Sequence, residues 1–306
     1  PAMTRFVSRR ELVLASPALA AVPWLAAAAQ APAPAPGAPA GLVRLIANEN
    51  PYGPAASARQ ALLATLDSAW QYPMGQDQAL KRLIAAREGL TPEHVMVGEG
   101  SGEILHIAGL LFGRDGQQVV AARPTFTFLQ DYARLLGGTL TEVPLDAQLR
   151  HDLPALGAAV GPATRLLYLC NPNNPTGTLV PGPEIRPFVA AMARRTTVLV
   201  DEAYLDLWDD WPAHTTTDRV RAGDPVIVTR TFSKLHGLAG LRVGYALAPP
   251  PLIKRLEQHR MTLLGAPGVA AATASYQDLE FQAFARARLR EAMGLTLAAI
   301  RDLGLR

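Results

Sequence analysis

The chain has 306 residues, of which 49% are hydrophobic and 18% charged, a composition that fits a folded enzyme-sized body and argues against disorder. Its 29 basic and 26 acidic side chains leave a net charge of +3, and the arginines form no basic stripe, which argues against nucleic-acid binding. The single cysteine, Cys170, excludes an internal disulfide and fits a packed thiol in an apolar strand.

The first residues resemble a twin-arginine export signal. Arg9 and Arg10 precede an Ala- and Leu-rich stretch that ends in small residues near position 29. Pro17 and Pro23 interrupt this stretch, so a membrane-spanning helix is the poorer interpretation. An Ala/Pro linker follows, and the protein is predicted to be exported to the periplasm. The alternative is a misassigned start before a cytoplasmic enzyme.

From residue 42 onward the pattern predicts alternating helices and strands. Helices are expected over residues 55–70, 76–88 with Gly89 as its end, 101–112, 126–136 and 183–195. Strands are expected over residues 94–97, 118–122, 139–143, 165–169, 198–200, 226–228 and 243–247. The remainder, residues 252–306, is predicted to be almost wholly helical. This alternation indicates an α/β fold, a mostly parallel sheet with helices on both faces.

A lysine stands where one of these strands ends. The apolar run 225–228 leads into a hydroxyl-rich turn that carries Lys234 and is followed by glycines. Ligands of open α/β sheets bind at the carboxyl ends of the strands, where a lysine in partly apolar surroundings can act as an amine nucleophile. Taken alone, Lys234 is equally well a surface lysine in a loop.

Three other strands end in unusual polar or glycine-rich segments. Residues 97–103 run from a strand into a helix, so their amides suit an anion, although a helix capped by Ser101 is the simpler interpretation. In residues 170–177, two prolines flank a pair of asparagines. This pattern predicts either a rigid turn that holds one Asn side chain in place or an ordinary tight turn. Asp201 ends another strand. It is either a buried acid, which needs a cationic or protonated partner, or a helix cap or surface acid. No His or acid cluster has metal-ligand spacing, which argues against a metal site.

One cofactor requires all of these groups, together with an arginine, Arg242, eight residues past the lysine. Pyridoxal 5′-phosphate needs a lysine for its aldehyde, a carboxylate for its ring nitrogen, a donor for its phenolic oxygen and an anion site for its phosphate. The segments therefore predict a pyridoxal-phosphate site at one edge of the sheet.

Four motifs in this order resemble the histidinol-phosphate aminotransferase branch of the class I/II aminotransferases, which have fold type I. They are residues 48–53, 170–177, 201–204 and 231–245, within a similarity that runs from about residue 42 to the end. The resemblance implies a homodimeric transaminase of amino-acid biosynthesis. Its amino donor would be histidinol phosphate or an aromatic or general amino acid, and its acceptor a 2-oxo acid.

The same resemblance assigns roles to individual residues. Lys234 would form the internal aldimine, Asp201 would pair with the pyridinium nitrogen, and Asn174 and Tyr204 would hold the phenolic oxygen. Lys234, Asp201 and Tyr204 are the expected catalytic residues. The expected phosphate ligands are Ser233, Arg242 and the backbone amides of Ser101 and Gly102.

Two aromatic residues complete the expected cofactor site. Phe126 matches the ring-stacking position, where the family commonly has a tyrosine, and Tyr72 matches a tyrosine that reaches the phosphate of the partner subunit. Gly102 stands where the family usually has an aspartate, which keeps the phosphate-binding amide and loses the side chain that supports the loop.

The resemblance also implies a division of the chain into four segments. These are a signal and linker (1–40), an N-terminal arm with part of a small domain (41–71), a large cofactor-binding domain (72–262) and the helical start of an incomplete small domain (263–306). Family members continue past the equivalent of Arg306, including the arginine that receives the substrate's anionic group. The chain is therefore expected to be a fragment; the alternative is that its substrate site is incomplete.

Three alternatives stay open. Decarboxylation or carbon–sulfur lysis would use the same cofactor contacts, since these contacts do not choose which bond breaks. The chain could also be a non-catalytic exported binding protein. A nicotinamide enzyme is the weakest alternative, because the glycine spacing is not that of a dinucleotide-binding turn.

Overall fold

The computed structural model of the chain describes residues 44–305. The predicted export signal and the Ala/Pro linker lie outside these residues. Residues from Ile46 onward form one compact unit, which is described here. In the described range, no helix combines the length and the apolar character that crossing a bilayer requires.

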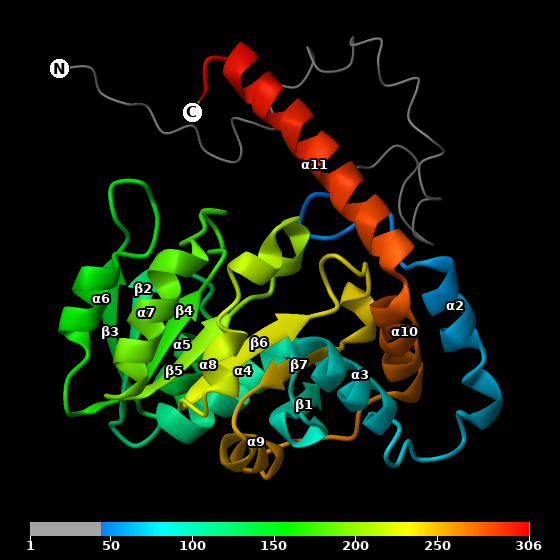
Figure 1. Cartoon of the computed structure of the whole chain (residues 1–306), viewed down its shortest axis with the longest axis horizontal. Coiled ribbons are helices and arrows are strands. Elements are labelled where there is room, and N and C mark those ends of the chain that lie inside the picture. Colours follow the sequence, from blue (N-terminus) through cyan, green and yellow to red (C-terminus); the bar gives the residue numbers. More distant parts are fainter. Residues whose placement is uncertain (1–43, 306) are drawn as a thin grey trace. The chain divides into compact units, whose positions relative to one another are not determined.

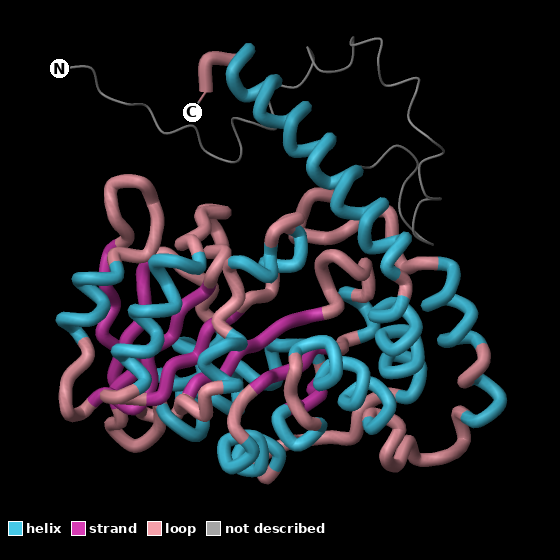
Figure 2. Tube along the Cα trace, in the orientation of Figure 1, coloured by secondary structure: helices cyan, strands magenta, loops and turns pink. Residues whose placement is uncertain are grey.

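A seven-stranded sheet forms the centre of the unit, in the order β1-β7-β6-β5-β4-β2-β3 (Figures 1 and 2). The strands are β1 Val95–Gly98, β2 Gln118–Arg123, β3 Thr139–Pro144, β4 Thr164–Cys170, β5 Thr197–Asp201, β6 Val226–Thr231 and β7 Gly244–Leu247. All neighbours are parallel except that β7 is antiparallel to both β1 and β6. Six strands therefore end at the same edge, and the predicted mostly parallel α/β fold is confirmed.

Helices cover both faces of this sheet. The helices are α2 Ala56–Leu63, α3 Gln78–Glu88, α4 Gly100–Phe112, α5 Phe128–Leu135, α6 Leu153–Ala159, α7 Gly182–Ala193, α8 Thr217–Arg221, α9 Pro250–Glu257, α10 Ala266–Gln277 and α11 Leu279–Asp302. One apolar core joins α3, α6, α7, α8 and α10 to one face, and a second joins α4, α5 and α9 to the other. Strand residues alternate between them: Val198 and Val200 belong to the first core and Leu199 to the second.

Two predicted helices differ from the observed ones. The single helix expected over residues 55–70 is wrong, because α2 ends at Leu63 and only a 3-10 turn, Leu66–Ser68, follows. The Thr65 hydroxyl donates to the carbonyl of Leu62 (2.7 Å) and so competes with the helical ladder. Gly89 ends α3 in the left-handed conformation (φ 64°), as predicted.

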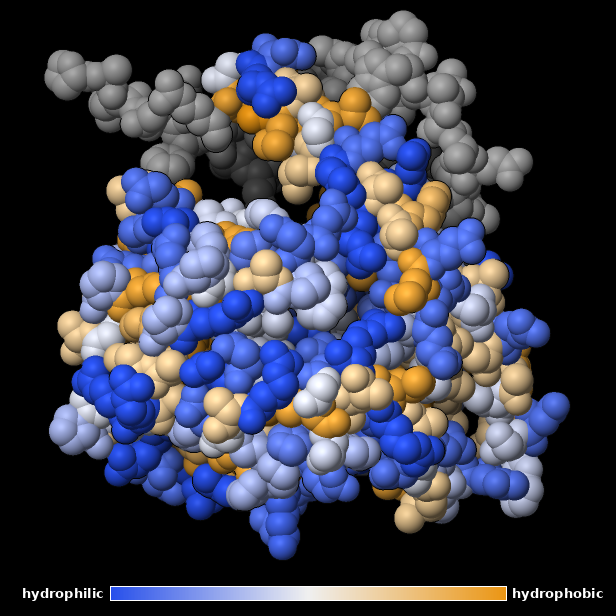
Figure 3. Space-filling view, viewed as in Figure 1, coloured by the Kyte–Doolittle hydropathy of each residue, from blue (hydrophilic) through white to orange (hydrophobic). Residues whose placement is uncertain are grey.

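The C-terminal part is helical in three pieces, α9, α10 and α11, with a loop over residues 258–265. Helices α6 and α8 were not predicted. Helix α11 extends from the body (Figure 1), and Figure 3 shows apolar side chains along it. Its exposed apolar residues include Met293, Leu295 and Leu297.

Candidate active site

The predicted site residues, except Tyr72, lie at the carboxyl edge of the sheet. Helix α4 follows β1, the proline-flanked amides follow β4, Asp201 ends β5, and Lys234 follows β6. Four segments that are far apart in sequence thus meet at one edge, which is where ligands of such sheets bind.

Lys234 is a half-buried amine with a neutral partner. Its Nζ donates to the backbone carbonyl of Asn48 (2.8 Å) and lies 5.2 Å from the ring centroid of Tyr204. Burial lowers the pKa of this amine, while the nearby charges of Glu49 and Asp201 raise it. A lysine whose pKa is lowered by burial is a better nucleophile and base near neutral pH.

Asp201 is a buried carboxylate held by hydroxyl groups. Its Oδ1 accepts from the Thr229 hydroxyl (2.9 Å), and the Tyr168 hydroxyl lies 3.5 Å from Oδ2. Burial raises the pKa of Asp201 to about 6. Across the described residues, no ion pair joins this carboxylate to a cation. A protonated ring nitrogen would offset its desolvation, so Asp201 fits the predicted cofactor.

The Tyr204 hydroxyl is oriented by two amides. Its oxygen accepts from Nδ2 of Asn48 (3.0 Å) and from Nδ2 of Asn174 (3.3 Å), so the hydroxyl proton remains free to donate. The loop that carries Asn174 is anchored by Asn171, whose side chain donates to and accepts from the backbone of Val180. Sequence reasoning missed Asn48 as a site residue, although it lies in a motif that the resemblance used.

An anion cradle forms where α4 begins. The helix starts at Gly100 with Glu99 as N-cap, so the interpretation of Ser101 as the cap is wrong. Glu103 instead accepts from the backbone N–H of Glu99 (2.7 Å), and Ser101 lies in the first turn, whose amides have no carbonyl partner within the helix.

Arg242 brings a cation to this cradle. Its backbone is left-handed (φ 52°), and its Nη1 lies 3.5 Å from the Ser233 hydroxyl. A Cβ at Gly100 would collide with the guanidinium group, so glycine is what lets Arg242 reach the start of α4. The Ser233 hydroxyl also accepts from Thr231 (2.9 Å). A guanidinium, a hydroxyl and free amides are the groups that bind phosphate, and the cradle fits that part of the cofactor.

Phe126 belongs to an aromatic stack beside α4. Its ring lies 4.5 Å from that of Phe128, which stacks on His106 at 5.4 Å. A Cβ at Gly102 would already touch the Phe128 ring at 3.4 Å. The Phe128 ring therefore lies beside Gly102 at ordinary contact distance for a Cβ.

Tyr72 lies apart from the other predicted residues. It is 83% exposed, in the segment between α2 and α3, and no described contact joins it to the site. Its expected role involves a partner subunit, so it stays a prediction.

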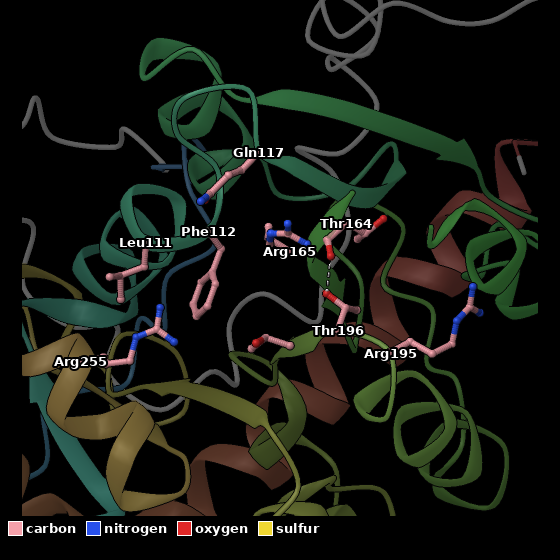
Figure 4. A pocket seen from close by; sticks show the side chains of 9 residues that line it. Leu111, Phe112, Gln117, Thr164, Arg165, Arg195, Thr196 and Arg255 are labelled. Carbon is pink, nitrogen blue, oxygen red and sulfur yellow. Dashed lines mark hydrogen bonds between the residues drawn. The ribbon is translucent and has the colours of Figure 1, made fainter. Parts of the chain in front are cut away.

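A hollow of about 300 Å³ lies at the opposite edge of the sheet (Figure 4). It is formed by the amino ends of β4 and β5 and by α4, and contains none of the predicted site residues. Its lining includes Phe112, Thr164, Arg165, Thr197 and Arg255. Across residues 44–305 there is no group of His, Cys, Asp and Glu side chains that could hold a metal ion.

Comparison with known proteins gives a consistent result. The profile of the family "Aminotransferase class I and II" matches residues 40–299. The chain is 41% identical over 220 residues to a histidinol-phosphate aminotransferase of Moorella thermoacetica, and 38% identical over 241 residues to histidinol-phosphate aminotransferase 2 of Ralstonia nicotianae. These alignments cover 72% and 78% of the chain, and 57% and 64% of the two relatives. The chain thus spans about three fifths of their length.

A solved structure is similar over much of its length. The histidinol-phosphate aminotransferase of Sinorhizobium meliloti, determined with pyridoxal-5′-phosphate, superposes with a TM-score of 0.75 at 30% identity. The match covers 80% of the chain and 67% of that protein.

Proposed function

The chain belongs to the class I and II aminotransferases, and on that premise we propose that it binds pyridoxal 5′-phosphate at Lys234 and transfers amino groups to a 2-oxo acid. The observation that carries this proposal is the meeting of a lysine of lowered pKa, a buried carboxylate and an anion cradle at one sheet edge. The names of the relatives favour histidinol phosphate as the donor; an aromatic or general amino acid would suit the proposed export better.

Each part of the cofactor has a group in this chain that would hold it. Asp201 would face the ring nitrogen, and Tyr204 and Asn174 the phenolic oxygen. Phe126 would stack on the ring. The phosphate would lie among Ser233, Arg242 and the first-turn amides of Ser101 and Gly102.

The proton transfers would depend on two side chains. The bound cofactor would supply an aldehyde for the amines and a ring that takes up the electron pair of the broken bond. The Nζ of Lys234, uncharged more readily because of its burial, would take the proton from the carbon that bears the amino group and later return a proton. The ionised Asp201 would stabilise positive charge beside it, and the Tyr204 hydroxyl would donate to a developing oxyanion.

A lyase or decarboxylase would use the same side chains, because none of them selects the bond that breaks. Incubation with an amino acid and a 2-oxo acid separates these activities. Transamination yields a new amino acid in equal amount to the new oxo acid, whereas release of carbon dioxide or a thiol would indicate the alternatives. A non-catalytic binding protein would yield none of these products.

We also propose that the protein is exported through its twin-arginine segment. Replacing Arg9 and Arg10 with lysine should retain the protein in the cytoplasm, because that export route reads the arginine pair as an address. Fractionation of cells that express both forms measures this. Replacing Arg59, which lies in α2 outside the signal, provides the control. Unchanged export of the lysine variant would contradict the proposal.

We further propose that two copies assemble through the segment between α2 and α3. This segment exposes Leu66, Trp70, Tyr72 and Met74 at 55 to 83%, and exposed large apolar and aromatic side chains are typical of protein interfaces. Changing Trp70 and Met74 together to serine should weaken dimerisation by about a hundredfold or more, as for central aromatic residues of interfaces.

Sedimentation over a range of concentrations measures this assembly. A serine at the exposed Leu149, in a different loop, controls for the loss of surface apolar area. If the unaltered protein sediments as a monomer at micromolar concentration, the dimer proposal is wrong.

A further inference from the structure

An N-terminal segment crosses the predicted lysine nucleophile. Residues 48–53, here called the strap, lie far from Lys234 in the sequence. None of the proposed cofactor contacts involves them. The Asn48 carbonyl accepts from Nζ of Lys234 (2.8 Å), and the Asn48 amide donates to the Tyr204 hydroxyl (3.0 Å). Asn48 thus contacts both Lys234, which is expected to take up and return a proton, and Tyr204, whose hydroxyl is expected to donate a hydrogen bond.

The strap is fixed to the lysine loop at two further points. Asn50 is buried, donates from Nδ2 to the carbonyl of Leu235 (2.8 Å) and accepts at Oδ1 from the backbone N–H of Tyr52 (3.0 Å). Gly53 lies against Gly237 so closely that a Cβ on Gly53 would be 2.6 Å from the Gly237 Cα. Leu235 directly follows the lysine, so the position of Asn50 and that of the amine are coupled through one short loop.

The strap also shapes the surroundings of the amine. It supplies the Asn48 carbonyl that covers Nζ, and it carries Glu49, whose charge acts on Lys234 together with those of Asp201 and Arg242. Burial is the largest influence on the pKa of the amine and lowers it, and the strap is one of the segments in direct contact with Nζ.

We propose, on the basis of the proposed function, that Asn50 is a positioning residue: by fixing the strap to the Lys234 loop it places the Asn48 carbonyl and amide against Lys234 and Tyr204. Asn50 touches neither reacting group. The bond from its Nδ2 to Leu235 holds the strap against the Lys234 loop, and the bond from Tyr52 fixes the turn within the strap, so that together they aim the lysine.

The test measures capture of pyridoxal 5′-phosphate by the cofactor-free protein, followed by absorbance after mixing, as a function of pH. Asn50→Ala removes both side-chain bonds, and Asn50→Asp keeps the acceptor for Tyr52 and loses the donor to Leu235. The capture rate constant should fall about ten- to thirtyfold in Asn50→Ala, as for the loss of two neutral hydrogen bonds. It should fall at least as far in Asn50→Asp, because that variant loses the bond that links the strap to the loop and places a carboxylate oxygen against the Leu235 carbonyl.

The pH midpoint of capture provides a readout that a merely structural role would not move. Because release of the strap exposes the amine to water, the midpoint should rise toward that of an ordinary lysine. Gln148→Ala, an exposed amide in a distant loop, should keep the rate and the midpoint of the unaltered protein.

The outcomes separate the two proposals. If the unaltered protein does not capture the cofactor at Lys234, the proposed function fails. If it does, and both Asn50 variants capture at its rate and with its pH midpoint, the role of Asn50 is overturned. Circular dichroism identifies a variant that does not fold, and Asn50→Asp then carries the test alone, since it retains size and one hydrogen bond.

Discussion

Replacing Lys234 with alanine should abolish amino-group transfer, with a loss of about 10³-fold or more, because no other amine can reach the same point. General acid–base catalysis alone contributes about 10² to 10⁴ in rate, and covalent attachment of the cofactor would be lost as well. The sequence contains two other lysines. Lys81 lies in α3 and is paired with Glu257 of α9 (2.6 Å), and Lys254 is exposed on α9.

Release of labelled oxo acid from a donor amino acid measures this loss. Lys254→Ala is the matched control, because it removes an exposed lysine that has no part in the site, and it should retain the unaltered rate. Transfer that persists over several turnovers in the Lys234→Ala protein would refute the assignment of this residue.

Replacing Asp201 with asparagine should have two opposite effects. Proton abstraction should slow by about a hundredfold or more, as when a preorganised electrostatic contact is removed from a transition state. The cofactor-free protein should become more stable at neutral pH, because the buried carboxylate no longer has to ionise.

The pH window follows from the shift of the Asp201 pKa. Burial raises this pKa from its ordinary 3.8 to about 6 in the folded protein. Between these values the folded state binds more protons than the unfolded state, so the stability of the unaltered protein falls as pH rises from 4 to 6. The difference between variant and unaltered protein should reach up to about 3 kcal/mol at pH 7 and shrink toward pH 4.

Urea unfolding of the cofactor-free proteins at several pH values measures this effect. Asp115→Asn is the control, because Asp115 is exposed in a left-handed turn that asparagine also accepts. Equal stability of the Asp201→Asn and unaltered proteins at pH 7, or an unchanged rate of proton abstraction, would contradict the role given to this carboxylate.

The strands and most helices could be predicted because their signals are local. Apolar runs such as residues 226–228 mark buried strands, and Gly89 marks a helix end. The end of α2 at Leu63 was not predicted, because the sequence around it favours a helix. The break depends on the hydrogen bond from the Thr65 hydroxyl to the Leu62 carbonyl, which competes with the helical hydrogen bonds. The start of α4 was placed one residue late for a similar reason, since Glu103 rather than Ser101 satisfies its first amide.

The site residues at strand ends could be predicted from the sequence. The residues that reach the site from loops elsewhere in the chain could not. Parallel strands bring their ends to one edge, so the placement of Asp201 and Lys234 followed from the pattern. Asn48 lies 156 residues from Tyr204 and 186 from Lys234, and no periodicity reports such contacts. The contact between Gly102 and the Phe128 ring likewise could not be predicted, because it depends on how the Phe128 side chain packs against α4.

Borohydride reduction tests the central claim most directly. The protein is incubated with pyridoxal 5′-phosphate, reduced, digested and mapped by mass spectrometry, which fixes the cofactor to the lysine that holds it. Because the chain contains only Lys81, Lys234 and Lys254, the result is unambiguous. The structure predicts one cofactor per chain on Lys234. No modification, or modification at Lys81 or Lys254 in place of Lys234, would contradict the account.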